Sequence, residues 1–74
     1  MSPSLHVLSG REVVRAFESL VWQIARQSGS HVIMVKGNEM TTLSIPDHRE
    51  VAKGTLRSLI RAAGVTVSEF IART

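Results

Sequence analysis

Apolar residues recur at helical spacing in two stretches of the chain, one in each half. The first stretch follows Ser9, and its apolar face consists of Val13, Val14, Phe17, Leu20 and Val21. The second begins near Lys53 and places Leu56, Leu59, Ile60 and Ala63 at i, i+3, i+4 and i+7. Gly64 follows, where a glycine can end a helix in the left-handed conformation. The pattern therefore predicts two amphipathic helices.

The start of the first helix carries a second, independent signal. Ser9 and Glu12 have the spacing of a capping box, in which each side chain accepts a hydrogen bond from the other residue's backbone N–H. Thr66 and Glu69 repeat that spacing near the end of the chain. We therefore expect a short closing helix over residues 67–72.

Between the helices, three short runs rich in β-branched and other apolar residues predict strands. They cover Trp22 to about Gln27, His31 to Lys36, and Thr41 to Ile45, and Pro46 ends the third run. Ser28-Gly29-Ser30 and Gly37-Asn38-Glu39 separate them, and both have turn composition. Turns this short favour an antiparallel three-stranded sheet.

The predicted fold class is α+β with two layers. The order is helix, three strands, helix and short helix, with both longer helices on one face of the sheet and the other face left to solvent or a partner. Trp22 and Ile24 are expected on one face of the first strand. This order and layering resemble the double-stranded-RNA-binding fold. We expect one domain over residues 1–74, with 1–8 as a flexible lead.

Composition narrows the range of functions. The chain has 74 residues and no cysteine, which excludes disulfides and thiolate chemistry. Its longest apolar run, Val32 to Val35, is far short of a membrane helix, and the start lacks a signal-peptide pattern, so a cytoplasmic protein is expected. A net charge of +3 mildly favours a polyanionic or acidic partner.

Three histidines are the candidates for metal binding or catalysis. His6, His31 and His48 lack the spacing of a metal site, so a metal centre is not expected. Ser30 and His31 are adjacent on a predicted strand and point to opposite faces, which argues against a serine nucleophile. No GxxxxGK phosphate loop is present.

Acid–base cleavage of RNA needs no metal, no serine nucleophile and no phosphate-binding loop. The ribose 2′-OH supplies the nucleophile, histidine can carry protons, and cations can stabilise the phosphorane. His31 has Arg26 and Lys36 at the two sides of its hairpin, and Lys53, Arg57 and Arg61 form a basic stripe. Taken alone, a strand histidine is more often a packed or surface residue, and such a stripe is more often a solvated helix face.

Three segments in order carry a more specific signal. They are Gly10-Arg11-Glu12-Val13-Val14, Arg26-Gln27-Ser28-Gly29-Ser30-His31, and the run from Pro46 to Arg57. Together they resemble the HicA toxins of bacterial type II toxin–antitoxin systems, over nearly the whole of residues 10–71. The resemblance implies a double-stranded-RNA-binding-like fold, cofactor-free mRNA cleavage, and neutralisation by a HicB-type antitoxin.

The resemblance also assigns a catalytic residue, and the residues around it and on the second helix supply candidate RNA contacts. It implies that His31, in the Gly-Ser-His motif, is catalytic. The candidate RNA contacts are Arg26, Gln27, Ser30, Lys36, Lys53, Thr55 and Arg57. A second proton carrier is left open between Lys36, His48 and a group of the substrate.

The form of one turn and the class of function are not fixed by the sequence. Val21 precedes Trp22 where family members commonly have glycine, which leaves the form of the helix-to-strand turn open. Fold and charge also allow a non-catalytic RNA-binding module or a protein-interaction domain.

Overall fold

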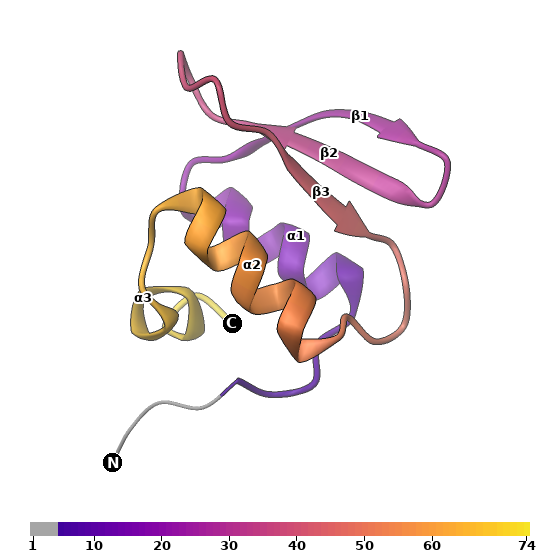
Figure 1. Ribbon diagram of the computed structural model, residues 1–74, viewed down its shortest axis with the longest axis vertical. Helices are drawn as coiled ribbons and strands as arrows, with labels where there is room; N and C mark the ends of the chain where they lie inside the picture. The colour runs from indigo at the N-terminus through magenta and orange to yellow at the C-terminus, as the bar shows by residue number, and fades with distance from the viewer. Residues whose placement is uncertain (1–4) are drawn as a thin grey trace.

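The computed structural model describes residues 5–74, and its elements follow the predicted order (Figure 1). They are α1 (Gly10–Ser19), β1 (Gln23–Ser28), β2 (His31–Val35), β3 (Leu43–Pro46), α2 (Lys53–Ala63) and α3 (Val67–Ile71). Each strand pairs with the next in an antiparallel sheet of order β1-β2-β3. The α+β class and the α-β-β-β-α order with a short closing helix are confirmed. Within residues 5–74, no helix has the length and apolar character needed to cross a membrane.

The strand register divides the side chains between two faces of the sheet, because directly paired residues share a face. Met34 pairs with Leu43 and Val32 pairs with Ile45. Three of these four side chains are buried, and Val32 packs against the core, so they define the face toward the helices. His31 alternates with Val32 and lies on the opposite face, which we call the open face.

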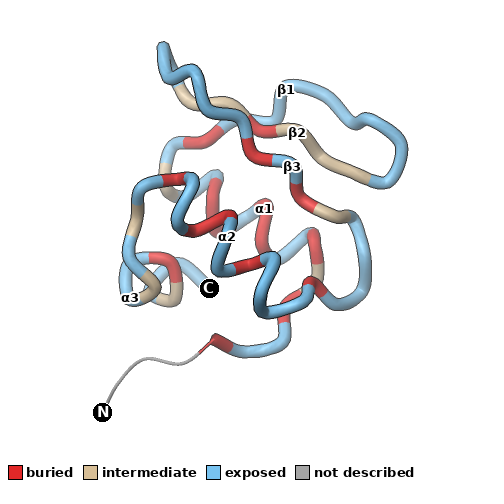
Figure 2. The backbone as a smooth tube through the Cα atoms, in the orientation of Figure 1, coloured by how far each residue is buried: buried red, intermediate tan, exposed pale blue. Residues whose placement is uncertain are grey.

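Both longer helices lie on the same side of the sheet, and the core fills the space between the two layers (Figures 1 and 2). Phe17 of α1 is central to it. Its ring centroid lies 5.0 Å from that of Phe70 in α3 and 6.4 Å from that of Trp22, the latter pair in an edge-to-face arrangement. The aromatic side chains thus join α1, α3 and the start of the sheet.

Both predicted capping boxes are present. The Glu12 N–H donates to the Ser9 hydroxyl oxygen at 3.2 Å, and the Ser9 N–H donates to the Glu12 carboxylate at 2.9 Å. Thr66 and Glu69 make the same reciprocal pair at the start of α3, with distances of 2.9 and 3.0 Å. These local hydrogen bonds satisfy N–H groups that the helices leave free, so they fix where each helix begins.

The end of α1 differs from the sequence prediction. The Val21 N–H donates to the Glu18 carbonyl at 3.1 Å and the Trp22 N–H donates to the Phe17 carbonyl at 3.0 Å, which is the Schellman pattern. Val21 adopts the left-handed conformation, with φ of 65°, and is 69% exposed. The prediction that it extends the apolar face of the helix is wrong, because the chain leaves the helix at this residue.

The segment before α1 is packed where the structure describes it. Residues 1–4 of the predicted flexible lead lie outside the described residues. Leu5 and Leu8 are buried in the core, and Leu8 forms an antiparallel bridge with Val51, whose N–H donates to the Leu8 carbonyl at 2.8 Å. This pairing holds the segment against the loop that leads into α2.

The sheet extends beyond the helices at β1. All six residues of β1 are exposed, including Ile24, which is 51% exposed although it pairs with buried Met34. Trp22, just before the strand, is buried. Ile24 lies on the side of the sheet that faces the helices but is left uncovered, since α1 lies under only part of the strand. A groove is left there between β1 and α1.

Candidate active site

His31 begins β2 directly after a tight turn. Ser28 and His31 pair across the hairpin, so only Gly29 and Ser30 lie between the strands. Gly29 has φ of 59°, a conformation that glycine adopts without steric cost. Glycine at the first central position of a two-residue turn is typical of type II′ hairpins, whose twist matches the strands. The turn therefore presents His31 at the very end of the sheet.

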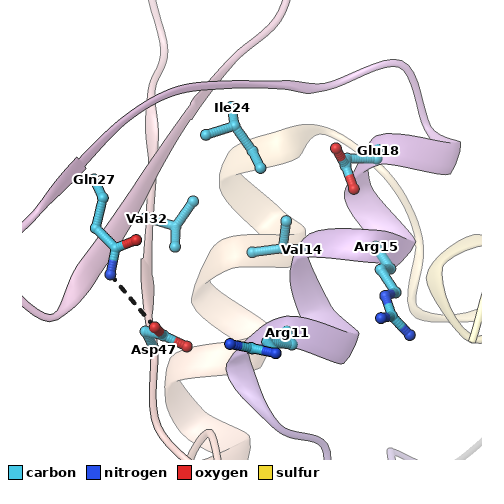
Figure 3. Close-up of a pocket in the computed structure, with 8 residues that line it drawn as sticks. All are labelled: Arg11, Val14, Arg15, Glu18, Ile24, Gln27, Val32 and Asp47. Carbon is cyan, nitrogen blue, oxygen red and sulfur yellow. Dashed lines mark hydrogen bonds between the residues drawn. The ribbon is translucent and has the colours of Figure 1, made fainter.

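The loop after β3 holds this turn in place. The Asp47 N–H donates to the Ser30 carbonyl at 2.7 Å, continuing the β2–β3 ladder by one bond. The Gln27 side-chain amide donates to the Asp47 carboxylate at 3.4 Å (Figure 3) and to the Gly29 carbonyl at 3.5 Å. These two bonds are long and exposed, so the short backbone bond is the main restraint on the turn.

The start of α1 packs directly on the same loop. The Gly10 N–H donates to the His48 carbonyl at 2.8 Å. A Cβ atom added at Gly10 would lie only 2.2 Å from the Pro46 carbonyl oxygen and 2.9 Å from the Asp47 Cα. Only glycine allows the helix to approach this closely. Gly10, the Gly29–Ser30 turn and the Pro46–His48 segment are far apart in sequence and meet here.

A β-bulge decides which side chains share a face with His31. The β1–β2 register shifts between Ile24 and Arg26, so Ala25 has no partner. Ile24 faces the helices, and strict alternation would put Arg26 on that side too. Because of the bulge, Arg26 pairs with Ile33 and joins His31 on the open face. Arg26 is thus a diagonal neighbour of His31, at a backbone separation of roughly 7–8 Å.

His31 itself is half-buried. Ser28 lies across from it on β1 and Pro46 across from it on β3. Pro46 is part of β3 rather than the residue after it, and the strand starts at Leu43 rather than Thr41. An imidazole in this position is open to a substrate on the open face and has a guanidinium nearby, an arrangement suited to proton transfer beside a phosphate.

The remaining candidate residues are more dispersed. Lys36 follows the far end of β2, five residues from His31, or roughly 16 Å at the rise of a strand. It lines a separate hollow with Trp22 and Gly37. Gln27 pairs with Val32, so it lies on the opposite face from Arg26. The structure therefore brings Arg26 and the Ser28–Ser30 turn to His31, but not Lys36.

The basic stripe on α2 belongs to the other layer. Lys53, Thr55, Arg57 and Arg61 are all exposed on that helix. Figure 1 shows α2 below the sheet, with its N-terminus next to the β3–α2 loop. An RNA chain that touches both His31 and α2 must therefore pass around the end of the sheet where this loop lies.

The carboxyl groups with shifted pKa values lie outside this cluster. The hydrogen bond from the Ser9 backbone lowers the pKa of Glu12, and that from the Thr66 backbone lowers the pKa of Glu69. In the part of the chain that the structure describes, no three His, Cys, Asp or Glu side chains gather in a way that could hold a metal ion.

Sequence reasoning missed two residues that shape the site. Gly10 makes room for the β3–α2 loop, and Asp47 ties that loop to the turn before His31. Both lie within segments that carry the family resemblance, but spacing along the chain gives no sign that these segments touch. Only the folded backbone shows the contact.

The layering of two helices on one face of an antiparallel meander, in the order α-β-β-β-α, defines a double-stranded-RNA-binding-like fold. The family model described as HicA toxin of bacterial toxin–antitoxin matches residues 10–65, from the first residue of α1 to just after α2. The chain belongs to the HicA toxin family. No curated protein and no solved structure matches it. As a member of this family, it is a toxin of a toxin–antitoxin system.

Proposed function

We propose that this toxin is an endoribonuclease that cleaves mRNA without a cofactor, with His31 as its catalytic residue. The observation that carries the proposal is the position of His31, half-buried on the open face at the end of a turn held by Asp47, with Arg26 turned to the same face. Family membership supplies the toxin role. Cleavage of mRNA would stop translation and growth, and a HicB-type antitoxin would neutralise it.

The chemistry proposed needs only groups of the protein and the substrate. The 2′-oxygen of a ribose attacks the adjacent phosphorus, and the bond to the 5′-oxygen of the next nucleotide breaks. A base takes the proton of the 2′-OH, and an acid gives one to the departing 5′-oxygen. The products are a 2′,3′-cyclic phosphate and a 5′-hydroxyl. His31 carries one of these protons.

Arg26 has a distinct role in this proposal. Its guanidinium can donate two hydrogen bonds to the phosphate oxygens, whose negative charge grows in the transition state. The bulge at Ala25 is what puts this side chain on the face of His31. Ser30 lies in the turn and would contact the neighbouring sugar. Gln27, on the other face of the sheet, would contact RNA that passes around the end of the sheet, where Lys53, Thr55 and Arg57 would hold a more distant part of the chain.

The candidates for the second proton carrier are Lys36, His48 and a group of the substrate. Lys36 is too far along β2 to act at the same phosphate as His31. His48 is exposed in the β3–α2 loop, with its carbonyl accepting from Gly10. If His48 acts, His48→Ala should remove one limb of the pH–rate profile, whereas a substrate or solvent group would leave both limbs in place.

A non-catalytic RNA-binding module is the main alternative, since the same basic surface would bind RNA without cleaving it. Purified protein incubated with RNA in a chelator separates the two. We expect fragments ending in a cyclic phosphate. RNA that stays intact but is retarded in a gel shift would support the binding module instead.

Growth provides a second readout. Expression of the parent protein should arrest growth of a bacterial host, and His31→Ala should relieve the arrest. His6→Ala is the matched control, because His6 is an exposed histidine away from the turn and should leave toxicity unchanged.

A further inference from the structure

Side chains on the open face of the sheet form rows that run across the three strands, because directly paired residues share a face. The row that contains the candidate catalytic histidine consists of Ser28, His31 and Pro46. The next row, which we call the Ile33 row, consists of Arg26, Ile33 and Ser44. Along β2, Ile33 lies roughly 6–7 Å from His31 at the rise of a strand. The Ile33 row therefore lies directly beside the candidate active site.

Ile33 is an apolar side chain on the face of the sheet that points away from the core. Both longer helices lie on the other side of the sheet (Figure 1). Ile33 is half-buried, whereas Arg26 and Ser44, which are paired with it on β1 and β3, are exposed. The isoleucine thus forms a recessed apolar floor, with a guanidinium group on one side and a hydroxyl group on the other.

The charges on this face favour a polyanionic partner. The chain has six acidic residues, and none of them lies on β1, β2 or β3. The strand residues of the open face are therefore neutral or cationic. The groove between β1 and α1 on the opposite side differs, because Glu18 and Asp47 line it beside its arginines. Of these two surfaces, the open face is the one where an RNA strand meets no carboxylate of the sheet.

We propose that the Ile33 row is a subsite for one unpaired nucleobase of the RNA substrate. The base belongs to a nucleotide that flanks the phosphate at His31, and the face of the base lies on the Ile33 side chain. The Ser44 hydroxyl makes a hydrogen bond to the edge of that base, while Arg26 holds the phosphate. This inference rests on the proposed function and adds a substrate class to it, namely RNA that is single-stranded at the point of cleavage.

An aliphatic contact with the base follows from where the aromatic residues of the chain lie. Bases of single-stranded RNA commonly stack on exposed aromatic side chains. Phe17, Trp22 and Phe70 are the only Phe, Trp or Tyr residues of the chain, and all three are buried in the core. Ile33 supplies the apolar contact instead. Because a hydroxyl group such as that of Ser44 can both donate and accept hydrogen bonds, we expect this subsite to discriminate little among the four bases.

A base-paired substrate does not fit this subsite. The bases of an A-form duplex are stacked inside it, and its accessible surface presents phosphates and 2′-hydroxyl groups. Such a surface gains nothing from an apolar floor between Arg26 and Ser44. The reaction favours a single strand as well, since the 2′-oxygen must come into line with the phosphorus and the departing 5′-oxygen, and the A-form backbone holds it out of line.

The test uses a short oligonucleotide of mixed sequence that is 2′-O-methylated except at one central ribonucleotide, so that only one bond can be cleaved. Two further versions lack the base, but keep the sugar, of the nucleotide on one or the other side of that bond. We expect the parent protein to cleave one of these two versions with kcat/KM lowered by about fivefold, a smaller effect than the loss of a base from an aromatic ring. Pairing of the complete substrate with a fully 2′-O-methylated complement should lower kcat/KM by about tenfold or more.

Matched variants locate the base. Ile33→Thr removes the apolar contact but keeps a β-branched side chain that suits a strand. It should lower kcat/KM by about fivefold on the complete substrate and leave cleavage of the sensitive base-less version unchanged, whereas a folding defect would slow both alike. Val35→Thr makes the same kind of change on the same face, further along β2 from His31, and should cleave every substrate like the parent.

The proposal would be overturned if the parent cleaved all single-stranded versions equally, or if it cleaved the duplex at the single-stranded rate. Equal slowing by Ile33→Thr on substrates with and without the base would also overturn it. If the parent cleaves no substrate, the proposed function fails, and the affinity of fully 2′-O-methylated strands, measured by fluorescence anisotropy, decides this inference. The parent should then bind the strand with the base about fivefold more tightly than the strand without it, and Ile33→Thr should bind the two equally.

Discussion

Replacement of Val21 by glycine should stabilise the protein, which few single substitutions do. Val21 has φ of 65°, and a residue with a branched Cβ in this region carries strain of about 1–3 kcal/mol. Glycine removes that strain, but the more flexible unfolded chain then loses more conformational entropy on folding, which costs about 0.5–1 kcal/mol of stability. Because Val21 is 69% exposed, the apolar burial lost is only about 0.5 kcal/mol.

At the middle of each range, about 2 kcal/mol of strain relieved less about 0.75 kcal/mol of entropy and about 0.5 kcal/mol of burial leaves Val21→Gly a gain of about 0.75 kcal/mol in the free energy of unfolding. In a domain of this size, that raises Tm by roughly 2–8 °C. The chain contains its own comparison, since Gly64 occupies the same position at the end of α2 with φ of 74°. Gly64→Ala should accordingly destabilise the protein by about 1 kcal/mol.

Urea unfolding followed by far-UV circular dichroism measures both effects. Val21→Ala is the informative control, because it loses nearly the same side chain as Val21→Gly but keeps a Cβ in the left-handed conformation. If Val21→Gly proves no more stable than Val21→Ala, the left-handed backbone carries no strain and the reasoning is wrong.

Three further predictions concern packing, pH and salt. Gly10→Ala should lower the free energy of unfolding by about 1–3 kcal/mol, because the new methyl group meets the Pro46–Asp47 backbone. Gly54→Ala, with open space around it, should be neutral or stabilising. If the two variants have equal Tm values, the close packing at Gly10 is refuted. Because the pKa values of Glu12 and Glu69 are lowered in the folded protein, their contribution to stability is fully present above the ordinary pKa of 4.5 and is lost as the pH falls through the lower folded-state pKa values. Replacing both residues by Gln should therefore make the urea midpoint less dependent on pH in that range. Arg26→Ala should weaken RNA binding and reduce the slope of log affinity against log salt by about 1, a change that filter binding at several salt concentrations detects.

Local signals in the sequence predicted the helices well. Each capping box depends on two residues three positions apart, so nothing distant is needed to form it. The same holds for Gly64, whose left-handed φ follows from its place after the last apolar position of the helix. The turn before His31 is likewise local, since glycine alone makes its backbone easy to form.

The face on which Arg26 lies could not be predicted in this way. Alternation from Trp22 through Ile24 puts Arg26 toward the helices, and only the unpaired Ala25 reverses this. No residue type in that strand signals a bulge, because alanine is ordinary at either a paired or an unpaired position. The pairing of β1 with β2 decides it.

Contacts between segments that are distant in sequence could not be predicted from the sequence either. The glycine at Gly10 matters because Pro46 and Asp47 pass within contact distance of it, and the exposure of Ile24 depends on how far α1 extends under the sheet. Leu5 and Leu8 lacked any periodic pattern but are buried, since β-bridge pairing with Val51 draws the segment inward. Each of these facts belongs to the packing of the whole chain.

The rate of RNA cleavage in a chelator, measured for the parent, His31→Ala and His6→Ala under single-turnover conditions, tests the central claim most directly. We predict that His31→Ala slows cleavage by about 10²–10⁴-fold, the usual contribution of a general acid or base, while its circular dichroism and RNA affinity stay close to those of the parent. His6→Ala should cleave at the parental rate. Cleavage by His31→Ala at the parental rate would contradict the account, whatever the identity of the second proton carrier.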